Sequence, residues 1–163
     1  MASSSSAIDG FKEYDVFLSF RGTDTRKNFT SHLYEALCRS NIKAFTDKKL
    51  DRGQEITPGL VRVIEGVKIS IIVFSSDYAS STFCLDELVT IMECNESKAQ
   101  TVLPIFYKVY PSPTSYQEAF ARHEDNFKRG KERRWYEIKK VKRWKSAFCK
   151  ALNLDGWHID DNR

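Results

Sequence analysis

Cysteine and histidine, the usual ligands of structural zinc, are scarce in this sequence and poorly placed for a shared site. Its 163 residues include three histidines and four cysteines, and the cysteines stand apart at Cys38, Cys84, Cys94 and Cys149. A structural zinc site usually needs a close pair such as Cys-x-x-Cys, and the sequence has none. We therefore expect no metal site, and four free thiols in a reducing compartment.

Long apolar runs are also lacking. The mean hydropathy is −0.48, and a membrane-spanning helix would need about 20 consecutive apolar residues. The segment Met1–Ser6 has neither the basic region nor the apolar region of a secretory signal. We expect a disordered leader over residues 1–11 and a cytoplasmic or nuclear location.

Apolar segments of strand length alternate with segments of helical periodicity. The expected strands cover residues 14–20, 42–47, 69–75, 101–107 and 156–159, and the expected helices cover residues 29–39, 58–66, 83–96, 116–127 and 131–152. Such alternation is typical of a parallel sheet with helices on both faces. The sequence predicts an α/β fold: a flavodoxin-like, doubly wound parallel sheet of about five strands. We expect one domain over residues 12–158, then a tail or the start of a linker at 159–163.

Local patterns predict which faces point inward and where helices begin and end. Thr57 and Pro58 fit a helix N-cap followed by the first helical position, and Asn41 fits a left-handed helix end. Pro104 places its strand near a sheet edge, because proline cannot donate a ladder hydrogen bond. The expected inward residues are Phe29, Leu33, Ala36 and Leu37 in the first helix and Ile138, Val141, Trp144, Phe148 and Ala151 in the last.

The carboxyl ends of the strands are the expected ligand-binding edge of such a sheet. Segments 21–26, 47–55 and 75–83 should form it. The segment 21–26 carries two arginines near a helix start, which suits a phosphate or ribose contact. The alternative is a loop that caps the helix and forms surface ion pairs. The sequence has no glycine-rich dinucleotide fingerprint here.

An ordered series of motifs resembles the TIR (Toll/interleukin-1 receptor/resistance protein) domains of plant immune receptors. The resemblance covers roughly residues 12–158, with Phe83 where the family usually has tryptophan. The motifs are Tyr14–Gly22 with Asp24–Arg26, Ser31–Leu33, Leu50–Ile56, Ile69–Ser75, Tyr78–Ser81, Cys84–Leu88, Pro104–Tyr107 and Leu154–Trp157.

This resemblance implies an NAD+ glycohydrolase in which Glu87 is the catalytic carboxylate. A carboxylate can stabilise the positive charge that develops on the ribose when nicotinamide departs. The alternative for Glu87 is an acid that merely favours the positive end of its helix. NAD+ is the substrate, with no further cofactor. The implied NAD+-binding residues are Arg21, Gly22, Thr23, Asp24, Thr25, Arg26, Gly53 and Phe83, of which Phe83 could instead be a core aromatic residue.

The same resemblance implies that other TIR domains are partners, through Ser31 and His32 on the first helix. For His32 the alternative is a solvated helix position. A non-catalytic adaptor that works only by contacts between TIR domains is the alternative for the whole chain.

Basic residues are concentrated between Lys128 and Lys150, within a chain of net charge +4. Such a run is usually a solvated helix face. Interleaved Trp135, Trp144 and Phe148 would also suit stacking on nucleic-acid bases. We expect at most weak, sequence-independent binding of nucleic acid.

Overall fold

Five parallel strands form the centre of the protein. The computed structural model describes residues 14–22, 29–46, 56–109, 113–129 and 134–159. The strands are β1 (Val16–Ser19), β2 (Ala44–Thr46), β3 (Ile69–Phe74), β4 (Thr101–Tyr107) and β5 (Trp157–Ile159), in the order β2-β1-β3-β4-β5. All four neighbouring pairs are parallel. This confirms the predicted flavodoxin-like sheet; the expected leader lies outside the described residues.

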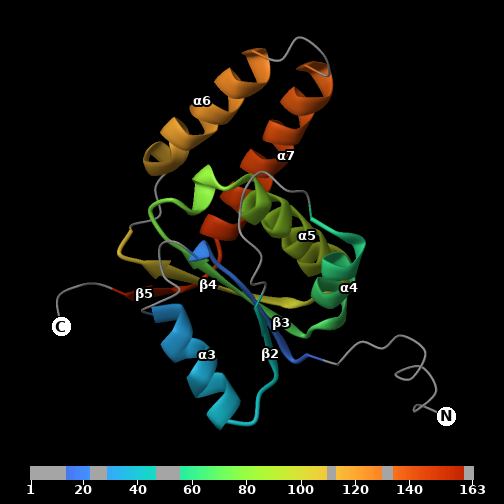
Figure 1. The fold of residues 1–163 in the computed structure, drawn as a ribbon, viewed down its shortest axis with the longest axis vertical. Coiled ribbons are helices and arrows are strands. Elements are labelled where there is room, and N and C mark those ends of the chain that lie inside the picture. Colours follow the sequence, from blue (N-terminus) through green and yellow to red (C-terminus); the bar gives the residue numbers. More distant parts are fainter. Residues whose placement is uncertain (1–13, 23–28, 47–55, 110–112, 130–133, 160–163) are drawn as a thin grey trace.

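Helices cover both faces of this sheet (Figure 1). One face carries α3, and the other carries α4, α5, α6 and α7. The 3-10 turn η1 connects β3 to α5. The bounds are α3 (Phe29–Arg39), α4 (Pro58–Gly66), η1 (Tyr78–Ser80), α5 (Thr82–Lys98), α6 (Pro113–Arg129) and α7 (Arg134–Leu152).

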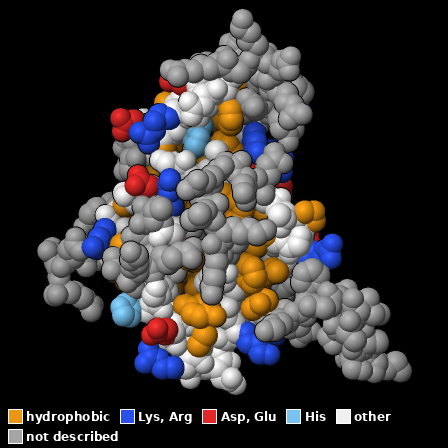
Figure 2. Space-filling view, viewed as in Figure 1, with side chains coloured by type: hydrophobic (Ala, Val, Ile, Leu, Met, Phe, Trp, Pro, Cys, Tyr) orange, Lys and Arg blue, Asp and Glu red, His pale blue; other side chains and the backbone are white. Residues whose placement is uncertain are grey.

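Alternating side chains of the strands divide the core into two clusters. Phe17, Ile72 and Phe74 point into the larger cluster, which includes α4, α5, α6 and α7. Val16 and Val73 point into the smaller cluster, against α3. Because β1 and β3 are buried on both faces, their sequences are continuous apolar runs rather than alternating ones. Hydrophobic side chains also reach the surface beside α3 (Figure 2).

The predicted helix boundaries are confirmed where capping residues mark them. Thr57 Oγ1 accepts a hydrogen bond from the Leu60 N–H at 3.2 Å, and Pro58 is the first residue of α4. Asn41 adopts a φ of 63° just after α3. For two residues the prediction of an inward-facing side chain is wrong. Ala36 is exposed on α3, and Ile138, near the start of α7, is 39% exposed.

Pro104 lies one strand in from the edge of the sheet, as its sequence predicted. The ladder between β4 and β5 begins at Ile105 paired with Trp157, one residue after Pro104. Gly156 precedes this ladder and lies against the Pro104 backbone. A Cβ atom at Gly156 would be 2.4 Å from the Pro104 carbonyl oxygen and 2.9 Å from its Cγ. Only glycine fits this approach without moving β4 or β5.

We predict that Gly156→Ala destabilises the fold by about 1–3 kcal/mol, because a backbone atom must shift to admit the methyl group. Gly66→Ala is the matched control, since no atom lies within 4 Å of the corresponding Cβ position at the end of α4. That variant should be neutral or more stable by up to about 1 kcal/mol. Urea unfolding of both variants measures the difference, and equal midpoints would contradict the prediction.

Candidate functional site

The ends of β1 and β3 meet the start of α5 at one edge of the sheet. Ser81 caps α5, since its Oγ accepts a hydrogen bond from the Cys84 N–H at 3.0 Å. Glu87 follows in the second turn and is 3% exposed. The structure therefore holds a buried carboxylate at the edge where the fold predicts a ligand.

Two hydroxyl groups are linked to this carboxylate, one directly and one through the other. Neither of them was assigned to the site from the sequence. Ser19 is the last residue of β1, and its Oγ donates to Glu87 Oε1 at 2.7 Å. The Tyr78 hydroxyl has one proton and two acceptors within reach, Ser19 Oγ at 2.7 Å and the Cys84 carbonyl at 3.2 Å. Ser19 and Tyr78 are both fully buried. A polar residue at the end of an apolar strand was the one available signal for Ser19.

The pKa of Tyr78 is raised well above its ordinary value, chiefly by burial and further by Cys84 and Glu87. The phenol therefore keeps its proton at neutral and moderately alkaline pH. It stays a hydrogen-bond donor throughout the range in which the protein would work.

Arg21 and Gly22 lie at the same edge of the sheet, after β1. Arg21 Nη1 donates to the Asp77 carbonyl at 3.0 Å, which ties the end of β1 to the turn after β3. The other predicted binding residues of this segment, Thr23, Asp24, Thr25 and Arg26, lie outside the described residues, as does Gly53.

Phe83 is on the same face of α5 as Glu87, one turn earlier. It is 8% exposed and belongs to the larger core cluster. Its side chain thus packs as a core aromatic residue. A stacking role for this ring stays a prediction.

Ser31 and His32 lie on α3, on the opposite face of the sheet from α5. His32 is exposed and Ser31 is partly buried. A contact made by His32 would therefore not touch Glu87, which fits the prediction that this surface is separate from the chemistry.

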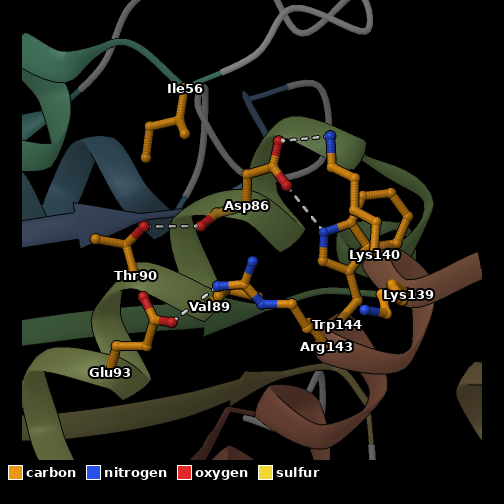
Figure 3. A pocket seen from close by; sticks show the side chains of 9 residues that line it. All are labelled: Ile56, Asp86, Val89, Thr90, Glu93, Lys139, Lys140, Arg143 and Trp144. Atoms are coloured by element: carbon orange, nitrogen blue, oxygen red, sulfur yellow. Dashed lines mark hydrogen bonds and ion pairs between the residues drawn. The ribbon is translucent and has the colours of Figure 1, made fainter. Parts of the chain in front are cut away.

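Asp86 points toward Lys140 and Trp144 of α7 (Figure 3). Its Oδ1 accepts a hydrogen bond from Trp144 Nε1 at 2.9 Å, and its Oδ2 lies 3.6 Å from Lys140 Nζ. These groups line a cavity of about 310 Å³ between α5 and α7. Trp144 is 1% exposed, so Asp86 serves mainly to anchor a buried indole.

The basic residues of α7 are largely paired with acids of neighbouring helices. Arg143 pairs with Glu93, Lys145 with Glu124 and Lys150 with Glu96, at 2.6–2.9 Å. Of the interleaved aromatic residues, Trp144 and Phe148 are buried in the core, while the Trp135 side chain is not described. These contacts favour a solvated, ion-paired helix face over a nucleic-acid surface.

Within the described ranges, no group of three or more acidic, histidine or cysteine side chains is placed to hold a metal ion. Among the helices of those ranges, none has the length and apolar character needed to cross a membrane.

A family model for the TIR domain matches residues 13–163. The chain belongs to the TIR domain family. Its TIR fold is also similar to the TIR domains of the activated Roq1 resistosome, a complex that directly recognises the pathogen effector XopQ. The two share 41% identity with a TM-score of 0.78, over 91% of this chain and 89% of that one.

The TIR domain is similar in sequence to plant disease-resistance proteins. It is 48% identical to the disease resistance protein RPV1 and 49% identical to RUN1, both of Vitis rotundifolia, over 99% and 91% of this chain. It is 48% identical to the TMV resistance protein N of Nicotiana glutinosa over 96% of this chain. The chain spans only 11–13% of the length of these relatives.

We predict that Asp86→Ala destabilises the TIR domain by about 1–3 kcal/mol, because it leaves the buried Trp144 N–H without its acceptor. Glu93→Ala is the control: it removes an exposed ion pair from the same helix and should cost about 1 kcal/mol or less. Guanidinium unfolding followed by tryptophan fluorescence compares the two. A larger loss for Glu93→Ala would show that Asp86 is not the anchor.

Proposed function

We propose that this TIR domain cleaves the nicotinamide–ribose bond of NAD+ when it self-associates, as a signalling domain of plant innate immunity. The bond between ribose C1′ and the pyridinium nitrogen breaks, and its electron pair leaves with neutral nicotinamide. The positive charge that develops at C1′ is stabilised by the Glu87 carboxylate. Addition of water at C1′ then gives ADP-ribose and one proton, and addition of an internal nucleophile gives a cyclic product.

The observation that carries this proposal is a carboxylate that is 3% exposed and hydrogen-bonded at the carboxyl ends of the strands. A buried carboxylate destabilises a fold unless hydrogen bonds or an opposite charge replace its hydration. A fold that keeps one is therefore a candidate for a functional role of that acid. A low-dielectric setting also strengthens its attraction for a developing cation. No protonation of the leaving group is required, so one carboxylate is sufficient for the chemistry.

NAD+ would lie along the edge formed by Arg21 and Gly22, with Phe83 and Glu87 facing it from α5. The guanidinium of Arg21 is suited to a phosphate oxygen. The proposed site also includes Thr23, Asp24, Thr25, Arg26 and Gly53, with NAD+ as substrate and no other cofactor.

Self-association is proposed to occur through Ser31 and His32 on α3, in the cytoplasm or nucleus. The similarity to TIR domains of an assembled resistosome supports self-association. It equally favours a second candidate, a non-catalytic adaptor acting only through contacts between TIR domains. Release of nicotinamide from NAD+ by concentrated protein distinguishes the two, since an adaptor releases none.

We predict that Glu87→Ala lowers the rate of nicotinamide release by about 10²-fold or more, because it removes the charge that stabilises the ribose cation. Glu96→Ala, an exposed acid later in α5, is the control and should retain the parent rate. Chromatography of nicotinamide together with circular dichroism checks both variants. A folded Glu87→Ala protein with the parent rate would refute the proposed chemistry.

We predict that His32→Ala lowers activity by weakening self-association rather than by altering the site. The specific activity of the parent should rise with protein concentration, and the variant should lose that rise. Sedimentation velocity and nicotinamide release, measured over the same concentration series, test this. If both measurements matched those of the parent, His32 would have no part in assembly.

A further inference from the structure

Three buried groups from different elements converge at the end of β1. Ser19 is 59 residues from Tyr78 and 68 residues from Glu87 in the sequence. Their side chains nevertheless form two consecutive contacts of 2.7 Å. Ser19 and Tyr78 are 0% exposed, and Glu87 is 3% exposed. Little water reaches this cluster, so its hydrogen bonds are set by the protein alone.

The direction of each proton follows from the inventory of donors and acceptors. A serine hydroxyl has one proton, and that of Ser19 is donated to Glu87 Oε1. Ser19 Oγ must then accept at its contact with Tyr78, so the single phenol proton is directed mainly at Ser19 Oγ, at 2.7 Å, and only in part at the Cys84 carbonyl, at 3.2 Å. The raised pKa of Tyr78 agrees with this, because the phenol stays protonated. The protons thus point in one direction, from Tyr78 to Ser19 to Glu87.

The phenol is itself held in place. Its ring packs edge-to-face against Phe74 with centroids 5.0 Å apart, and its hydroxyl also reaches the Cys84 carbonyl at 3.2 Å. Tyr78 therefore has little freedom to release Ser19. Accepting from a fixed donor restricts rotation of the Ser19 hydroxyl and favours the arrangement in which its proton points at the carboxylate.

We propose that Ser19 and Tyr78 are positioning residues for the reaction: Ser19 fixes the Glu87 carboxylate, and Tyr78 fixes the hydroxyl proton of Ser19. This inference rests on the proposed cleavage of NAD+. Neither residue needs to contact the substrate. Their effect is on how often the carboxylate faces ribose C1′. Misplacement of a catalytic group by about 1 Å can cost up to 10²-fold in rate.

The predicted signature is a fall in kcat with little change in KM. Substrate binding depends mainly on contacts at the phosphates and rings, which these two hydroxyls do not make. Ser19→Ala should lower kcat by about tenfold or more, and Tyr78→Phe by a smaller factor, because Ser19 can still donate to Glu87 when Tyr78 is removed. KM should stay within about threefold of the parent value for both variants.

The chain provides matched controls for both substitutions. Ser70 is a buried serine of β3, and Tyr116 is a buried tyrosine of α6; each is at most 3% exposed. Neither hydroxyl has a hydrogen-bond partner among the described residues. Ser70→Ala and Tyr116→Phe should therefore leave kcat at the parent value, and thermal stability should be unchanged or raised because a buried unpaired hydroxyl is lost. They remove the same atoms as the test variants, from hydroxyls with no hydrogen bond to Ser19, Tyr78 or Glu87.

The experiment is a double-mutant cycle on nicotinamide release, with Glu87→Ala measured in parallel. Because Tyr78 acts through the Ser19 hydroxyl, the double variant should match Ser19→Ala within about twofold. Independent structural effects would instead multiply, and that result would overturn the proposal. If Ser19→Ala fails to fold, a parent-like kcat for folded Tyr78→Phe overturns the role of Tyr78, and a kcat loss with unchanged KM supports it.

Failure of the proposed function is distinguishable from failure of this inference. A parent protein that releases no nicotinamide, or a Glu87→Ala variant that still does, overturns both. An activity that requires Glu87 but survives Ser19→Ala and Tyr78→Phe overturns the positioning role alone.

Discussion

Burial of Glu87 is the constraint on which the arrangement of the strand ends depends. A carboxylate withdrawn from water is destabilised by several kcal/mol unless donors replace its hydration. Here a hydroxyl at the end of β1 supplies one donor. This contact requires the end of β1 to lie against α5, as it does where α5 packs on the larger core cluster. The fold thus places Glu87, the one deeply buried acid among the described residues, where parallel sheets bind ligands.

The turn η1 links this site to α6, which lies farther from the strand ends. On one side, Asp77 accepts a hydrogen bond from Arg21. On the other, the Ala79 carbonyl lies 2.8 Å from His123 Nε2, a buried group of α6. Tyr78 lies between these two anchors. The turn η1, which carries Tyr78, is thus held on one side by the segment after β1 and on the other by α6.

The sequence predicted the sheet, the helix positions and the edge at which Glu87 lies, because apolar periodicity and caps are local signals. The sequence did not predict features that depend on contacts between distant segments, such as the burial of single helix residues and the partners of buried hydroxyl groups. Ala36 and Ile138 have the right spacing to face inward, but periodicity gives the direction of a face and not the extent of the surface that covers it. Ser19 and Tyr78 were missed because their roles arise from contacts across 59 and 68 residues of sequence.

Asp86 and Glu87 are adjacent acids with opposite surroundings, and this contrast allows the most direct test. Carboxyl carbon NMR signals of both can be followed while adding an NAD+ analogue whose ribose ring oxygen is replaced by a methylene group, which resists cleavage. If NAD+ binds at Glu87, the Glu87 signal should shift in proportion to occupancy. The Asp86 signal should not shift, because the Asp86 carboxylate is bonded to Trp144. A shift confined to Asp86, at the cavity between α5 and α7, would contradict binding at Glu87.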